Sequence, residues 1–269
     1  MTRLGGWIVG VIVLAAAVGP VLVPHDPATQ QLALRLDGPS LAHPFGLDEL
    51  GRDVLARVLA GARVSLLVGL AVVSVSSALG LFFGSLAGFF GGRVDDAISR
   101  VIDVLMAFPG ILLAIALVAV LGPSLVHVVM ALSVIGWVGY ARLVRGQVMR
   151  ARELEYVAAA TAMGASVGRV LVRHVVPAAL PALVVQATLG MAGIIIAEAS
   201  LSFLGLGVQP PTPSWGAMLD GGRSHLLDAP HVTLFPGACL ALLVLGFNFL
   251  GDGLRDAIDP RVLSGRRRR

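Results

Sequence analysis

Six long apolar runs, separated by short polar stretches, limit how this chain can fold. A helix needs about 20 apolar residues to cross the roughly 30 Å hydrocarbon core of a bilayer. Hydrophobic residues make up 57% of the chain and charged residues only 13%, about half the charge of a typical soluble domain. We therefore predict an all-α integral membrane protein with six transmembrane helices, at residues 4–23, 64–90, 101–121, 125–144, 178–203 and 234–250.

The first three runs carry further signals. The first could be a cleavable signal peptide led by Arg3, but it is long for one and ends in prolines, so we expect an uncleaved span. In the second run, small residues predict close packing against other spans. Pro109 in the third run predicts a kink. The small residues of the second run are Gly69, Ser74, Ser76, Ser77, Gly80, Gly84, Ser85 and Gly88.

The distribution of arginine predicts the orientation. With the N-terminus inside, the inner segments hold 15 of the 20 basic residues and the outer segments hold 5, which are Arg35, Arg52, Arg57, Arg63 and Arg223. Because positive charge favours the cytoplasmic side, we expect both termini in the cytoplasm. We divide the chain into an N-terminal span with an extracytoplasmic segment (1–63), a transmembrane domain (64–252) and a basic tail (253–269) that binds anionic lipid.

Residues 155–177, EYVAAATAMGASVGRVLVRHVVP, differ from a simple connection between spans. The alanine-rich start favours a helix, and Gly164 suits the position that ends one. Ser166 can cap a second short helix from about Val167, and Pro177 can stand in the first turn of the next span. We predict a cytoplasmic docking loop, roughly residues 151–177; an ordinary loop would need far fewer residues.

Other functions have little support in the residue pattern. The chain has no lysine, so it cannot form a phosphate loop that ends in Gly-Lys-Ser/Thr. The six histidines show no i, i+4 pair, and Cys239 is the only cysteine; we predict no metal site and no catalytic residues. The basic residues lack interleaved aromatics, so we expect no nucleic-acid partner.

Glu198 is the one acidic residue near the interior of a span. Acidic residues in membranes often serve function, and a place in the translocation pathway is one interpretation. Its position near the outer end of the fifth run also permits simple contact with water.

Four blocks of the sequence resemble the permease subunits of bacterial ATP-binding-cassette (ABC) importers, of the second or C-type, in the dipeptide, oligopeptide and nickel group. They are HPFGLDELGRDVLARVLAGARVSLLVG (43–69), the docking loop, LSFLGLGVQPPTPSWGAML (201–219) and NFLGDGLRDAIDPR (248–261). The loop departs from the family pattern at Ala158, which stands at the family's glutamate. Glu155 is the nearest acidic residue. His174 stands where the pattern has isoleucine.

The resemblance implies a type I ABC-importer permease fold with a cytoplasmic coupling helix. It also implies a homologous permease partner, two ATPase domains that bind ATP and Mg²⁺, and an external solute-binding protein facing residues 24–62 and 206–231. This subunit would have no cofactor or enzymatic activity of its own. Peptides are the expected solute, nickel is the alternative, and a stand-alone carrier is less favoured. The expected ATPase-coupling residues are Glu155, Tyr156, Ala158, Ala159, Ala160, Gly164, Ala165, Arg169 and Pro177.

Overall fold

The computed structural model describes residues 2–258, and the regular structure in that part of the chain is helical. The order is α1 (Thr2–Leu22), α2 (Val54–Phe90), α3 (Gly92–Met106), α4 (Gly110–Leu121), α5 (Leu125–Arg152), α6 (Glu155–Ala162), α7 (Val167–Val170), α8 (Val176–Phe203), α9 (Trp215–Gly222) and α10 (His231–Ile258). A π turn (Leu171–Val175) joins α7 to α8. Short 3₁₀ turns lie at Leu32–Leu34 and Arg223–His225.

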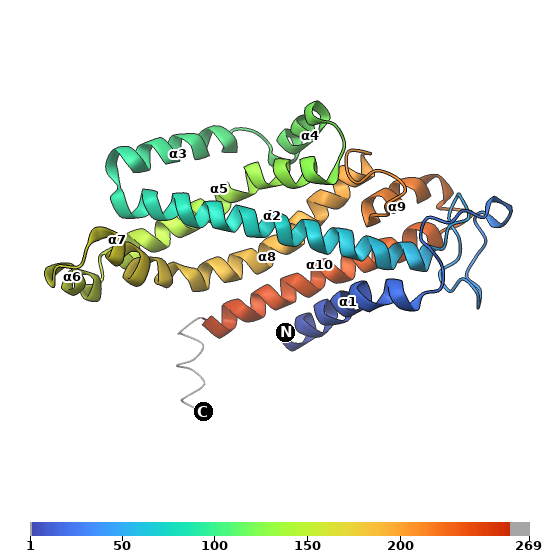
Figure 1. The fold of residues 1–269 in the computed structure, drawn as a ribbon, viewed down its shortest axis with the longest axis horizontal. Coiled ribbons are helices and arrows are strands. Elements are labelled where there is room, and N and C mark those ends of the chain that lie inside the picture. Colours follow the sequence, from blue (N-terminus) through green and yellow to red (C-terminus); the bar gives the residue numbers. More distant parts are fainter. Residues whose placement is uncertain (1, 259–269) are drawn as a thin grey trace.

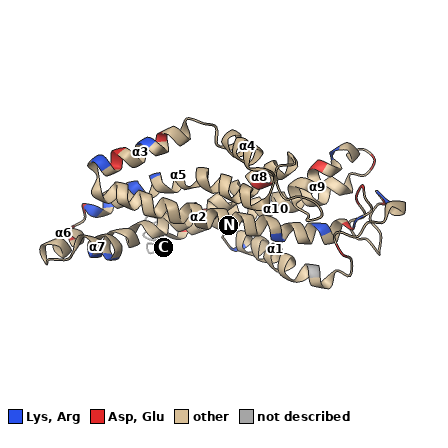
Figure 2. Cartoon of the chain, turned by 45° about the horizontal axis from the view of Figure 1, so that its top comes forward, with Lys and Arg blue, Asp and Glu red and all other residues tan. Residues whose placement is uncertain are grey.

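Four long helices, α2, α5, α8 and α10, form the body of the molecule, and α1 lies against α10 and α2 (Figure 1). Helices α6 and α7 lie at one end of this bundle, while residues 23–53 and α9 lie at the other. The start of α1 meets the end of α10, since a Cβ on Gly253 would clash with Thr2. Charged residues gather on α3 and at the two ends, and the middle of the bundle has few (Figure 2).

Five helices are long and apolar enough to cross a membrane, or six spans if α3 and α4 count as one bent pair. The kink predicted at Pro109 is present as a sharp break, but the predicted start of the third span at residue 101 lies inside α3. Residues 93–100 are helical rather than a polar link, and α3 and α4 meet at an angle of 83°. Pro109 explains the break, because proline disfavours the helical conformation in the residue before it. Its own ψ of 118° is not helical.

The helices cross both predicted domain boundaries. Helix α2 begins at Val54, well before the boundary at residue 63, because the Asp53 side chain accepts a hydrogen bond from the backbone N–H of Ala56 and caps it. Helix α10 passes residue 252 and ends at Ile258. Most of the predicted basic tail, residues 259–269, lies outside the described residues.

The most extensive contact between described helices joins α2 to α5, and glycine allows the two to pack closely. Cβ atoms built on Gly80, Gly84 and Gly88 would lie 2.3–2.7 Å from atoms of α5. On the facing helix, Gly136 gives the same room to the Ser76 side chain. The predicted close packing of the second run is confirmed, and it follows the small-residue rule for membrane helices.

We expect Gly84→Ala to destabilise the protein. The new methyl group would lie 2.5 Å from the carbonyl oxygen of Ala141, and overpacking of this kind costs roughly 1–3 kcal/mol. Thermal unfolding of the purified protein measures the effect. Gly10→Ala is the matched control, because a Cβ there meets nothing within 4 Å. If the two variants unfolded at the same temperature, the close packing of α2 against α5 at Gly84 would be contradicted.

Candidate functional site

The loop between α5 and α8 contains the sharp glycine turn predicted from the sequence. Gly164 has a φ of +83°, a left-handed conformation that glycine adopts without steric cost. The N–H of Ala165 donates to the carbonyl of Ala160 at 3.1 Å, and the N–H of Gly164 donates to Thr161 at 3.0 Å. This pair of bonds is the Schellman motif that ends a helix, so α6 ends at a defined residue.

The second half of the loop differs from the prediction. Ser166 stands at the N-cap of α7, but its side chain makes no capping hydrogen bond. Helix α7 is also not separate from the next span, because the π turn continues it into α8 and Val167–Phe203 forms one span. Pro177 lies in the first turn of α8, as predicted. The loop is thus one short helix attached through a tight turn to the span itself.

The inner side of α6 is fixed to both neighbouring spans. Val157 is buried in a cluster with Val148 of α5 and with Val175 and Ala179 on the α8 side. The Tyr156 hydroxyl donates to the carbonyl oxygen of His174 in the π turn at 3.1 Å. Packed apolar contacts of this kind transmit displacement rather than absorb it. Helix α6 therefore moves with the ends of α5 and α8.

The outer side of the loop is exposed and largely apolar. Met163 is 83% exposed and Val167 is 57% exposed, and Leu154 and Tyr156 are also open. An exposed apolar patch of this kind is typical of a surface that contacts another protein or a membrane. Of the predicted coupling residues, Ala160 is buried and Ala165 is half-buried. Those that are exposed are Glu155, Tyr156, Ala158, Ala159, Gly164, Arg169 and Pro177.

Glu155 and Ala158 lie one turn apart on α6, and both are exposed. Residues three apart on a helix are neighbours on one face. The carboxylate of Glu155 therefore reaches the surface around Ala158, where the family pattern has its acid. That Glu155 substitutes for this acid stays a prediction.

A groove of about 660 Å³ lies between α5, α8 and α10. Its wall on α8 consists largely of small and apolar residues, whereas Gln147, Gln186 and Arg255 supply polar groups from the three helices. These three residues carried no motif in the sequence and were not foreseen. The groove is bounded by the two helices that carry the docking loop.

Glu198 lies elsewhere and is not open to water. Its side chain is 1% exposed, so the alternative of a carboxylate that reaches water at the membrane surface is wrong. The Ser65 hydroxyl of α2 donates to Glu198 Oε2 at 3.0 Å, and the Ser202 hydroxyl donates to Oε1 at 2.7 Å. These bonds satisfy a buried polar group and link α8 to α2. Its role in the pathway stays a prediction.

At the opposite end of the bundle, three charged side chains of the first block (43–69) are buried. Asp48 Oδ2 accepts from Arg52 Nε at 2.7 Å and lies 3.2 Å from Arg57 Nε. All three side chains are buried. The indole N–H of Trp215 on α9 donates to the carbonyl of Val58. Residues of the first and third blocks therefore hold residues 23–53, here called the outer segment, and α9 against α2.

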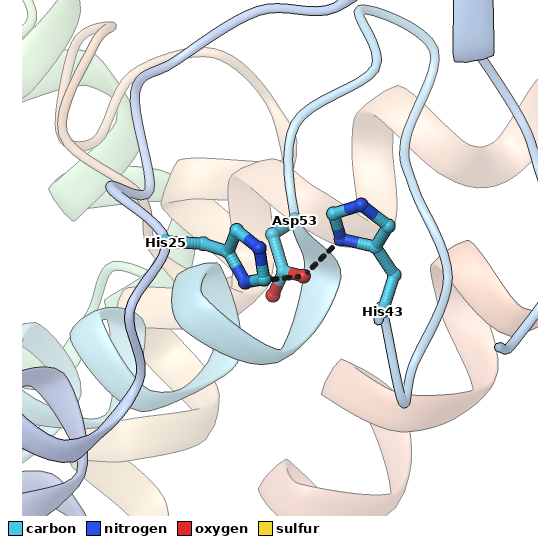
Figure 3. A group of neighbouring side chains, drawn as sticks. All are labelled: His25, His43 and Asp53. Atoms are coloured by element: carbon cyan, nitrogen blue, oxygen red, sulfur yellow. Dashed lines mark hydrogen bonds and ion pairs between the residues drawn. The ribbon is translucent and has the colours of Figure 1, made fainter. Parts of the chain in front are cut away.

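The same outer segment brings together three groups that can bind a metal ion. His25, His43 and Asp53 each offer a ligand atom, and these atoms lie within 4.8 Å of one another (Figure 3). The spacing of the histidines along the sequence predicted no metal site, because only the fold brings these three residues together. Imidazole nitrogens with a carboxylate oxygen suit Zn²⁺ and similar ions.

Long apolar helices around a groove, with a rigidly attached docking loop at one end, define a membrane transport subunit. Residues 80–264 match the family described as the binding-protein-dependent transport system inner membrane component. Residues 1–44 match the N-terminal TM domain of oligopeptide transport permease C. The chain belongs to this family of ABC-importer permeases, which confirms the resemblance found in the sequence.

Named relatives agree with the family over most of the chain. The dipeptide transport system permease protein DppC of Alkalihalophilus pseudofirmus is 45% identical over 262 residues, which cover 96% of this chain and 86% of that protein. The glutathione transport system permease protein GsiD of Pectobacterium atrosepticum is 45% identical over 260 residues, with the same coverage of 96% and 86%. GsiD of Shigella dysenteriae is 50% identical over 226 residues, covering 84% and 75%.

The fold also matches a solved structure. A chain in the inward-facing MetNI methionine ABC transporter aligns with a TM-score of 0.62 at 20% identity, covering 76% of this chain and 96% of that chain. At this identity the likeness concerns the fold alone. The predicted type I ABC-importer permease fold is confirmed.

Glu198→Gln provides a direct test of the role of the buried carboxyl group. Because the amide keeps the size of the side chain, a role in transport predicts normal amounts of assembled complex with reduced solute uptake. Complex yield and uptake into vesicles are the two measurements. Loss of the assembled complex with no uptake defect per complex would instead identify Glu198 as the hydrogen-bond partner that joins α8 to α2.

Proposed function

We propose that this chain is one of two paired permease subunits of an importer for small peptides. The single observation that carries the proposal is that the same two helices, α5 and α8, contact both the docking loop and the groove. They hold the docking loop at one end and line the groove over the halves next to that loop. A displacement of α6 is thereby converted into a change of the groove, which is the rigid-body coupling that an externally driven transporter needs.

Peptides fit the chemistry of the groove better than nickel does. Its polar groups are the amides of Gln147 and Gln186 and the guanidinium of Arg255. Amides pair with peptide groups, and arginine pairs with a terminal carboxylate. Among the described residues that line it, none is a histidine, cysteine or carboxylate that would favour Ni²⁺. The named relatives are a dipeptide permease and glutathione permeases.

The energy source lies on partner chains in this proposal. The sequence lacks the lysine of a phosphate loop, so ATP and Mg²⁺ are bound by two ATPase domains and this subunit is no enzyme. The exposed apolar surface around Met163 is the face offered to an ATPase. The second permease covers the open side of the groove, and a solute-binding protein docks at the end formed by α9 and residues 23–53.

The proposed orientation places α6 and both termini in the cytoplasm of a bacterial inner-membrane system. In a Cys239→Ser background, a cysteine at Ser40 should react with an impermeant thiol reagent in intact cells. A cysteine at Ser264, outside the described residues, should react only after the cells are permeabilised. Ser40 is exposed in the outer segment. The opposite labelling pattern would invert the topology and remove the ATPase-docking role of the loop.

Gly164→Val tests the coupling itself. Valine in the left-handed conformation costs about 1–2 kcal/mol, and its branched side chain crowds the turn. We expect α6 to be reoriented while the spans, packed elsewhere, stay assembled. Solute uptake by reconstituted complex should then fall, while ATP hydrolysis persists or becomes independent of the binding protein.

Gly168→Val is the matched control. Gly168 lies in the same loop, within α7, without a positive φ, and a Cβ there meets nothing within 4 Å. It should keep uptake and hydrolysis coupled. Full, coupled uptake by Gly164→Val would show that the loop does not transmit the motion, and uptake by the purified chain without ATPases would favour a stand-alone carrier.

A further inference from the structure

We propose that His25, His43 and Asp53 form a binding site for a divalent transition-metal ion of the Zn²⁺ type. The site is distinct from the groove and from the docking loop, and it lies at the outer end of the bundle (Figure 3). Its three ligands come from separate places in the chain. His25 follows α1, His43 belongs to the irregular segment before α2, and Asp53 is the N-cap of α2.

The distances suit a shared ion. Asp53 Oδ2 lies 2.7 Å from His43 Nδ1 and 3.6 Å from His25 Nδ1. Atoms bound tetrahedrally to Zn²⁺ at about 2.1 Å lie about 3.4 Å from one another. The His25 separation is close to this value, and the His43 separation would reach it by a small rotation of the side chain.

The capping hydrogen bond of α2 fixes the orientation of the Asp53 carboxylate without any bound ion. Asp53 Oδ1 accepts the capping hydrogen bond from the N–H of Ala56 at 2.7 Å, which leaves Oδ2 directed at the two imidazoles. His43 alone would complete an ordinary hydrogen-bonded pair. The second imidazole, His25, points at the same oxygen from beyond hydrogen-bond distance, and the two rings lie 4.6 Å apart between centroids. A bound ion accounts for both histidines at once.

An opening leads to these ligands. A cavity of about 250 Å³ is lined by the three side chains together with Pro24, Asp26, Thr29 and Gln31. It gives an ion access and leaves room for water at the fourth coordination position, as in zinc sites with three protein ligands. Two nitrogen donors with one oxygen donor favour a transition metal over Mg²⁺ or Ca²⁺, which prefer oxygen ligands.

A bound metal ion would stabilise the position of the outer segment relative to α1 and α2. Residues 23–53 hold one short 3₁₀ turn and otherwise lack helix, so their position depends on backbone hydrogen bonds between turns and on side-chain contacts. An ion held by His25, His43 and Asp53 ties the end of α1 and this segment to the first turn of α2. Because it binds the folded segment, the ion stabilises it by mass action.

The test uses the assembled importer, purified without a polyhistidine tag and stripped with a chelator. Equilibrium titration with Zn²⁺ should reveal a saturable site in the wild-type complex that His25→Ala weakens about ten-fold or more, since even losing a group that only orients a ligand costs about 10–100-fold. His25 makes no hydrogen bond to Asp53 at 3.6 Å, so His25→Ala leaves the His43–Asp53 pair in place.

His225→Ala is the matched control. Its side chain is 27% exposed, close to the 32% of His25, and it also lies beside an aspartate, Asp228, at 3.1 Å. It should bind Zn²⁺ as the wild type does. Zn²⁺ should raise the unfolding temperature of wild type and His225→Ala but not of His25→Ala, with all three equal in chelator.

A second measurement does not depend on any variant. Co²⁺ in place of Zn²⁺ should give the intense visible absorption of a four-coordinate site with nitrogen ligands in the wild-type complex. Equal Zn²⁺ affinity in wild type and His25→Ala, or a Co²⁺ complex with only the weak spectrum of the hydrated ion, would overturn the proposal.

Discussion

Across a lipid bilayer, each backbone N–H and C=O group must find its hydrogen-bond partner within the protein, and this constraint orders the whole molecule. The long helices meet it by themselves, so irregular backbone lies mainly at the two ends of the bundle, apart from the break between α3 and α4 at Pro109. The Schellman turn at Gly164 lies at one end, and the segment between α1 and α2 lies at the other. The positions where this chain can contact soluble partners are therefore set by the same rule that sets its spans.

The two ends of the bundle differ in the side chains that they expose and bury. At the loop end, α6 presents an open apolar surface on one side and packs against α5 and α8 on the other. At the outer end, Asp48 is hydrogen-bonded to Arg52 and lies beside Arg57 in a buried charge network. Such a network adds little net stability, since desolvation offsets the attraction, but it fixes the position of chain that has almost no helix of its own. One end is exposed and apolar, and the other is held by buried charges.

The sequence was most informative where structure depends on neighbouring residues. The apolar runs predicted the spans, and Gly164 predicted its turn because the left-handed C′ position is a local property. The sequence did not predict structure that depends on contacts between residues far apart in the chain. The ion pair of Asp95 with Arg145 of α5 holds α3, which no local pattern indicated, and the burial of Glu198 depends on Ser65 in another helix. His25, His43 and Asp53 meet only once α1, the outer segment and α2 are assembled, so their spacing in the sequence carried no signal.

Helix α8 connects these features in one mechanical element. Near its outer end, Glu198 is bonded to Ser65 of α2, and α9 packs so closely that a Cβ on Gly216 would clash with the carbonyl oxygen of Ala199. Its inner half lines the groove and continues through the π turn into the docking loop. Helix α8 is thus held by α2 and α9 near one end and joined to the docking loop at the other. Force applied at α6 is therefore expected to open or close the groove while the outer segment stays in place.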